Sequence, residues 1–189
     1  MKPAAQRLWA GVRTWCWNWL KDWRSHALTL LLIAAVVWGV NAWQTRHIPA
    51  GAAPGFSAPL AGAPAGTLIA LDEWRARHPG RAVALHFWAD WCPICRLEEG
   101  SVSSVQQDWP VLAVAMRSGT EQHVADVLQQ RGLPWLSVTD AHGSLTARYG
   151  LKAVPAFIVL DARGDIRYAA VGYTTQAGMR LRLWLAQHF

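Results

Sequence analysis

The chain has 189 residues, of which 52% are hydrophobic, and a formal net charge of +6. Most of the excess charge lies in the first 47 residues, which contain six basic side chains and one acidic side chain. The remaining residues contain twelve basic and eleven acidic side chains. This distribution argues against nucleic-acid binding by the larger C-terminal part. It indicates a membrane-associated N-terminal segment joined to one domain of ordinary size.

Residues 1–26 are basic and rich in tryptophan. Apolar side chains recur there at steps of three and four residues, which predicts an amphipathic helix lying flat in the cytoplasmic headgroup layer, or a juxtamembrane stretch that only anchors the chain. Cys16 lies in this segment, and we expect it to remain a free thiol in reducing surroundings. The residues that form the apolar face are Leu8, Val12, Trp15, Trp19 and Trp23.

Residues 27–43 form an apolar run that is just long enough to span a bilayer. Five basic residues precede the run and only Arg46 follows it closely. The positive-inside rule therefore predicts a single-pass anchor in the inner (cytoplasmic) membrane, with the N-terminus in the cytoplasm and the remainder of the chain in the periplasm. A cleaved signal peptide is the alternative, because residues 50–52 resemble a cleavage site. The long leader and the charge of Arg46 favour the uncleaved anchor.

Residues 44–66 consist mostly of proline, alanine and glycine, with a proline at every fifth position from Pro49 to Pro64. This composition predicts an extended linker that could hold a domain up to about 60 Å above the bilayer. The domain itself is then expected to comprise residues 67–189.

After the linker, short apolar runs alternate with helical patterns, which predicts strands that alternate with helices. Asp72 and Thr120 are expected to cap two of the helices, and an Ala-Arg-Gly-Asp turn closes a β-hairpin. Met179, Leu183 and Trp184 are spaced to pack the last helix on the sheet. The predicted strands are residues 66–71, 81–89, 111–116, 135–138 (a short strand or loop), 156–161 and 166–171, and the predicted helices are residues 72–78, 92–108, 120–130, 145–149 and a last helix from residue 174 or 175.

Cys92-Pro93-Ile94-Cys95 directly follows the strand predicted at residues 81–89. Two cysteines three residues apart at a helix start place both sulfur atoms on one face, where a disulfide can form and break with little backbone movement. Cys92 is expected to face solvent at the helix tip, where the helix dipole favours its thiolate form. Pro93 suits the first helical position. The pattern therefore predicts a redox-active pair.

Two alternatives to a redox pair are a metal site and an inert buried pair. A zinc site requires four ligands, and the third cysteine, Cys16, lies far away in a different segment, so we expect no metal ligands here. Trp88 and Trp91 are expected to pack on either side of the turn and to shield the disulfide.

Residues 87–96, which read F-W-A-D-W-C-P-I-C-R, resemble the F-W-A-x-W-C-x-x-C-[KR] motif of thioredoxin-fold oxidoreductases. Glu98 follows Cys95 by three residues, as in the C-x-x-C-x-x-E of the membrane-anchored TlpA/ResA-like branch. Cys-Pro-x-Cys in an anchored chain is also similar to the copper-sensitivity-suppressor (Scs) D-type proteins. The resemblance covers residues 67–189. It implies an α/β thioredoxin fold, a central mixed β-sheet flanked by helices, to which the N-terminal transmembrane helix is added.

The resemblance also implies a substrate site. Val154-Pro155 precedes a predicted strand at the place where this family carries a cis-proline that faces the active site. The backbone around Val154 would then bind an extended substrate segment as an added strand, with Trp91 and Pro93 beside it. A trans proline that only starts a strand is the alternative.

Exchange requires Cys95 to lose a proton, and two residues are candidates for the base. The resemblance implies that Glu98 tunes the acidity of the thiols. His86 lies where many thioredoxins have a buried acidic residue, and it is either the base or a core histidine. The residues expected to be solvated at the surface are Asp90, Glu99, His78 and His123.

The expected function is that of a periplasmic thiol-disulfide oxidoreductase with no cofactor beyond the redox-active pair Cys92 and Cys95. Cys92 attacks a substrate disulfide and Cys95 then releases the product. The resemblance implies reduction of periplasmic proteins, with electrons from a membrane thiol transporter, whereas Pro93 resembles strong oxidants. The alternatives are a disulfide oxidase or isomerase of the same fold, acting on dithiols, and a non-enzymatic metal-handling domain.

Overall fold

The structure is a computed structural model that describes residues 23–189. The predicted amphipathic helix lies outside the described residues except for its end, and so does Cys16. The chain divides into two compact units, residues 1–43 and residues 44–189.

The first unit contains most of α2 (Trp23–Thr45), a helix of 23 residues. Its stretch Ser25–Thr45 has the length and the apolar composition needed to cross a bilayer, and none of it is buried against other described residues. The predicted span, residues 27–43, falls within this helix. The helix therefore fits a membrane anchor, although a signal sequence has the same length and composition.

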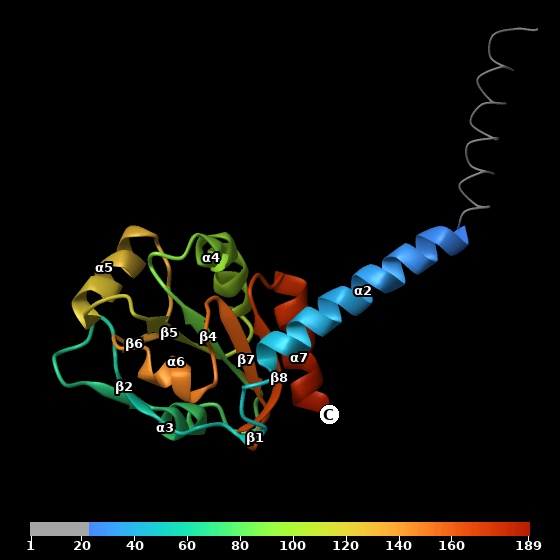
Figure 1. The fold of residues 1–189 in the computed structure, drawn as a ribbon. Helices are drawn as coiled ribbons and strands as arrows, with labels where there is room; N and C mark the ends of the chain where they lie inside the picture. The colour runs from blue at the N-terminus through green and yellow to red at the C-terminus, as the bar shows by residue number, and fades with distance from the viewer. Residues whose placement is uncertain (1–22) are drawn as a thin grey trace, which may run out of the picture. The chain divides into compact units, whose positions relative to one another are not determined.

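A mixed sheet of six strands forms the centre of the second unit (Figure 1). It consists of β1 (Gly51–Ala52), β4 (Val83–Trp88), β5 (Val111–Met116), β6 (Ser137–Asp140), β7 (Ala156–Leu160) and β8 (Asp165–Val171). The strand order is β1-β8-β7-β4-β5-β6. β4, β5 and β6 are parallel to one another. The pairs β4–β7, β7–β8 and β8–β1 are antiparallel. β4, which leads to Cys92, is therefore an inner strand, and all six of its residues are buried.

Both faces of the sheet are covered, because alternate residues of β4 point to opposite sides. Ala84 and Trp88 lie on one face and Leu85 and Phe87 on the other. The first face is covered by α4 (Pro93–Val105), α5 (Glu121–Gln130) and α7 (Gln176–His188). The second face is covered by α3 (Leu71–Ala76), α6 (Ser144–Arg148) and a small antiparallel pair, β2 (Ser57–Pro59) and β3 (Leu68–Ala70).

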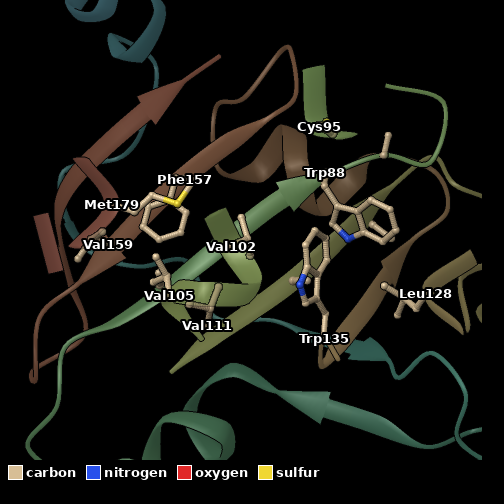
Figure 2. Packing of buried hydrophobic residues seen from close by; sticks show 14 of the residues in the cluster. Trp88, Cys95, Val102, Val105, Val111, Leu128, Trp135, Phe157, Val159 and Met179 are labelled. Carbon is tan, nitrogen blue, oxygen red and sulfur yellow. The ribbon is translucent and has the colours of Figure 1, made fainter. Parts of the chain in front are cut away.

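Aromatic and aliphatic side chains fill the first face (Figure 2). Trp88 from β4 and Trp135, which precedes β6, meet edge to face with ring centroids 5.3 Å apart. Phe157 from β7 and Met179 from α7 belong to the same buried cluster. Trp88 therefore packs as predicted, and this core supports the strand end from which Cys92 follows.

Residues 51–66 belong to the domain, and the prediction of an extended linker is wrong for them. β1 pairs with β8, and β2 pairs with β3. The Tyr149 hydroxyl donates a hydrogen bond of 2.8 Å to the main-chain oxygen of Pro54, and the Tyr149 ring meets Phe56 edge to face. The prolines lie at strand ends or outside the ladders, where a missing N–H loses no strand hydrogen bond. Only residues 46–50 separate α2 from β1.

Two local predictions also require correction. α3 begins at Leu71, so Asp72 lies in the first turn, where its charge suits the helix dipole, and not at the cap. On α7, Met179 and Leu183 are buried as predicted, but Trp184 is exposed. The last helix therefore packs with a narrower apolar face than its sequence spacing suggested.

Candidate active site

The turn after β4 places Cys92 at the N-terminus of α4. Cys92 is the N-cap residue, with extended backbone angles (φ −88°, ψ 112°), and its Sγ accepts a hydrogen bond of 3.2 Å from the N–H of Cys95. Pro93 follows in the first turn, as predicted. Both thiols are free in this structure. Within the described residues, the Cys95 N–H thus contacts the sulfur atom of Cys92 directly.

Both cysteines are more buried than predicted, with 4% of Cys92 and 1% of Cys95 exposed. The loop before β7 covers the helix start, and the Cys92 thiol donates a hydrogen bond of 3.7 Å to the main-chain oxygen of Val154. The Val154-Pro155 bond is cis, which confirms the geometry that the resemblance implied. The loop before β7 therefore lies directly against the sulfur atom of Cys92.

Trp91 flanks the same site. Its ring is exposed, and its Nε1 donates a hydrogen bond of 3.2 Å to the main-chain oxygen of Arg117. The structure thus holds Trp91, Pro93 and Val154 around Cys92. Their binding to a substrate remains a prediction.

Glu98 lies one turn beyond Cys95 and is buried. Its carboxylate accepts a hydrogen bond from the N–H of Thr174. Burial raises the pKa of Glu98 to about 7, although the bond from Thr174 opposes the shift. Burial also raises the pKa of Cys95 above its ordinary value, and the Cys92 thiol and the charge of Glu98 add to this rise. Glu98 is therefore a group that titrates near neutral pH within electrostatic reach of Cys95.

His86, the other predicted base, is fully buried on β4. Its ring lies edge-on to Trp135 at 5.4 Å and is 6.3 Å from the Phe157 ring. Neither ring nitrogen has a hydrogen-bond partner among residues 23–189. Burial lowers the pKa of His86 to about 3, so the imidazole is neutral at physiological pH. These surroundings are those of a core histidine, and a role for His86 as base remains a prediction.

The turn between β4 and α4 is held by side chains that the sequence predicted to be solvated. Asp90 Oδ2 lies 3.0 Å from His123 Nε2, and the Asp90 N–H donates to Ser118 Oγ at 3.1 Å. Arg131 donates to the main-chain oxygen of Asp90 at 2.9 Å and forms an ion pair of 2.7 Å with Glu99. The prediction is therefore wrong for Asp90 and Glu99, which are partly buried, whereas His123 is exposed as predicted. His123 and Arg131 are 33 and 41 residues from Asp90, so no local pattern indicates these contacts.

The remaining candidate residues lie outside this arrangement. His78 is partly buried, with its ring centroid 5.2 Å from that of Trp74, so it is also less solvated than predicted. Within residues 23–189, no three histidine, cysteine, aspartate or glutamate side chains cluster closely enough to hold a metal ion.

Comparison with known proteins agrees with this geometry. The model of the Redoxin family matches residues 51–180. The chain belongs to the Redoxin family. The match begins at β1, which is consistent with the packing of residues 51–66 on the domain.

Similar proteins include a "Thioredoxin-like protein" from Haemophilus influenzae, which is 30% identical over 124 residues covering 65% of this chain and 70% of that protein. "Thiol:disulfide interchange protein DsbE" from Pseudomonas aeruginosa is 27% identical over 131 residues, or 69% of this chain and 70% of that protein. A putative DsbE structure from Chlorobium tepidum has a TM-score of 0.63 at 22% identity, covering 74% of this chain and 99% of that chain. A secreted thiol-disulfide isomerase from Corynebacterium glutamicum has a TM-score of 0.62 at 21% identity, covering 71% of this chain and 85% of that chain. The predicted thioredoxin fold is thus confirmed, and the chain is a thiol-disulfide oxidoreductase of DsbE/ResA type.

Proposed function

We propose that this chain is a membrane-anchored, periplasmic reductase of protein disulfides. The observation that carries the proposal is the burial of Cys95 beside Glu98. Burial and a neighbouring negative charge disfavour the thiolate of Cys95, and a thiol that resists ionisation forms a more stable disulfide. Such a pair donates electrons, whereas a strong oxidant has a stabilised reduced form.

The reaction begins when the Cys92 thiolate attacks one sulfur of a substrate disulfide. A bond forms between Cys92 Sγ and that sulfur, the substrate S–S bond breaks, and the second substrate sulfur leaves as a thiolate that takes a proton from solvent. Cys95 then transfers its proton to the Glu98 carboxylate and attacks Cys92 Sγ. The mixed disulfide breaks, the substrate sulfur leaves as a thiolate that takes the proton back from Glu98, and the substrate is released as a dithiol. The Cys92–Cys95 disulfide remains, and two electrons have passed to the substrate.

The next cycle requires two electrons and two protons, and we propose a membrane thiol transporter as their source. An anchored domain outside the cytoplasm would meet such a donor at the membrane surface. The length and composition of α2 and the basic residues before it support this location. Alkaline phosphatase fused after Phe189 should be active in intact cells, and activity only of a cytoplasmic reporter at that position would reject the orientation.

The reduction potential of the Cys92–Cys95 couple tests the direction of the reaction. After equilibration in redox buffers and alkylation, we expect a value near that of thioredoxin, about −270 mV. A value near about −120 mV, typical of a strong oxidant, would instead select a disulfide oxidase or isomerase. The hydrogen bond from Cys95 N–H to Cys92 Sγ favours this second candidate, because it stabilises the reduced form.

A further inference from the structure

α7 has an outer face that the interior of the domain does not use. Its inner face packs on the sheet, but Leu181 and Trp184, which lie one turn apart, expose 56% and 47% of their surface. The Trp184 ring lies 4.6 Å from the His188 ring, with an angle of 30° between their planes. These contacts hold an aromatic group in place at the surface of the domain.

The outer face is the surface formed by Leu181 and Trp184, and the charged side chains near it are positive. α7 contains no acidic residue. Arg182 donates a hydrogen bond to a main-chain oxygen of its own helix, and Arg167 of β8 donates one of 3.0 Å to the main-chain oxygen of Phe189. Within the described part of the chain, neither guanidinium lies at ion-pair distance from an aspartate or glutamate side chain, but that of Arg167 is engaged by the Phe189 oxygen. Arg182 is therefore available to pair with anionic groups outside the domain.

The C-terminal end of α7 lies close to the point where the chain enters the domain. Gly51 of β1 pairs with Ile166 of β8, and Arg167 is the next residue along β8. Neighbouring strands are about 4.8 Å apart. Since Arg167 also bonds to the main chain of Phe189, the end of α7 is tied to the strand with which β1 pairs.

The connection from α2 to the domain is short. α2 ends at Thr45 and β1 begins at Gly51, so even a fully extended connection spans only about 20 Å. Part of it already lies against the domain, because a Cβ atom at Gly150 would lie 1.9 Å from the main-chain oxygen of His47. If α2 crosses the membrane, as proposed above, β1 and the adjacent end of α7 are confined to the neighbourhood of the bilayer surface.

We propose that the outer face of α7 docks on the lipid surface of the membrane that α2 spans. Leu181 and Trp184 insert among the headgroups, where tryptophan is enriched in membrane proteins, and Arg182 pairs with an anionic lipid phosphate. This inference rests on the proposed anchoring but not on the direction of the redox reaction. Docking of this face gives the domain one orientation, and with it gives Cys92 a fixed position relative to the bilayer.

Photo-crosslinking of the full chain in lipid vesicles tests this docking. Leu181 is replaced by p-benzoylphenylalanine, and lipid adducts are measured by mass spectrometry in phosphatidylcholine vesicles with and without phosphatidylglycerol. Leu68 on β3 is the matched control, because it is 55% exposed and lies over the other face of the sheet. The same photoreactive residue placed at Trp38, within α2, reports by its lipid adduct whether α2 is inserted in the bilayer. We expect about tenfold more lipid adduct at Leu181 than at Leu68. Arg182→Gln should lower the adduct about fivefold only when phosphatidylglycerol is present.

Three outcomes would overturn the proposal, and they are distinguishable. Equal labelling of Leu181 and Leu68, with strong labelling of Trp38, would reject docking while the anchor stands. An absence of lipid adduct at Trp38 would reject the anchor and the docking together. Crosslinks from Leu181 to a second copy of the chain in place of lipid would identify this face as a protein interface.

Discussion

Replacement of Glu98 by glutamine removes the proposed proton acceptor but keeps the shape of the side chain and an oxygen that can accept the Thr174 N–H. With a pKa of about 7, the native carboxylate is ionised in about half of the molecules at pH 7 and in about a tenth at pH 6. If the carboxylate accepts the Cys95 proton, the rate at which Cys95 resolves a mixed disulfide should rise about fivefold between these two pH values. It should level off near pH 8.

In Glu98→Gln we expect the inflection near pH 7 to disappear and the rate at pH 8 to fall about 100-fold, the lower end of the usual contribution of a general base. The assay mixes the reduced full chain with a fluorescent peptide disulfide, stops the reaction with acid at short intervals, and quantifies the mixed disulfide by mass. Glu99→Gln is the control, because this carboxylate pairs with Arg131, and it should keep the inflection. Retention of the inflection in Glu98→Gln, or its loss in Glu99→Gln, would refute the assignment.

Three further predictions concern stability. The pKa of Glu98 is 4.5 in the unfolded chain and about 7 when folded, so between these pH values the folded protein keeps a proton that the unfolded chain releases. Stability should therefore fall as the pH rises from 4.5 to 7. Urea unfolding should show Glu98→Gln more stable than the native chain by about 2 kcal/mol at pH 8 but not at pH 4. Folding lowers the pKa of His86 from 6.5 to about 3, so stability should also fall as the pH decreases from 6.5 to 3. His86→Leu should remove that part of the loss. A tenfold slower thiol-disulfide exchange in this variant would identify His86 as the base. Arg131→Ala removes a hydrogen bond to Asp90 and the ion pair with Glu99. It should lower the free energy of urea unfolding by about 1–2 kcal/mol and speed alkylation of Cys92. Unchanged alkylation would show that the turn is held without Arg131.

The redox centre is predictable from the sequence because its determinants are local. A continuous apolar run specifies β4, the turn and the N-cap follow directly, and Pro93 marks the first turn of α4. Glu98 and the cis bond before Pro155 have no comparable local pattern, and only the resemblance to a family indicated them. The burial of Cys92 could not be predicted, since it results from a loop about 60 residues further along the chain.

The errors share a physical origin, since each depends on contacts between distant parts of the chain. The prolines and alanines of residues 51–66 are typical of a spacer, yet Phe56 packs against Tyr149, and two short strands find partners. Asp90 is paired through residues on α5 and just after it. The spacing of Trp184 fits a buried helix face, but α7 packs on the sheet through Met179, Leu183 and Ala186 and leaves Trp184 exposed.

The two-cysteine mechanism is tested most directly by trapping the mixed disulfide in the full chain. Cys95→Ala, incubated with a peptide disulfide and examined by mass spectrometry without reductant, should accumulate one peptide bound at Cys92, whereas Cys92→Ala should bind none and the native chain should release the reduced peptide. The absence of an adduct in Cys95→Ala, or an equal adduct in Cys92→Ala, would contradict attack by Cys92 and resolution by Cys95.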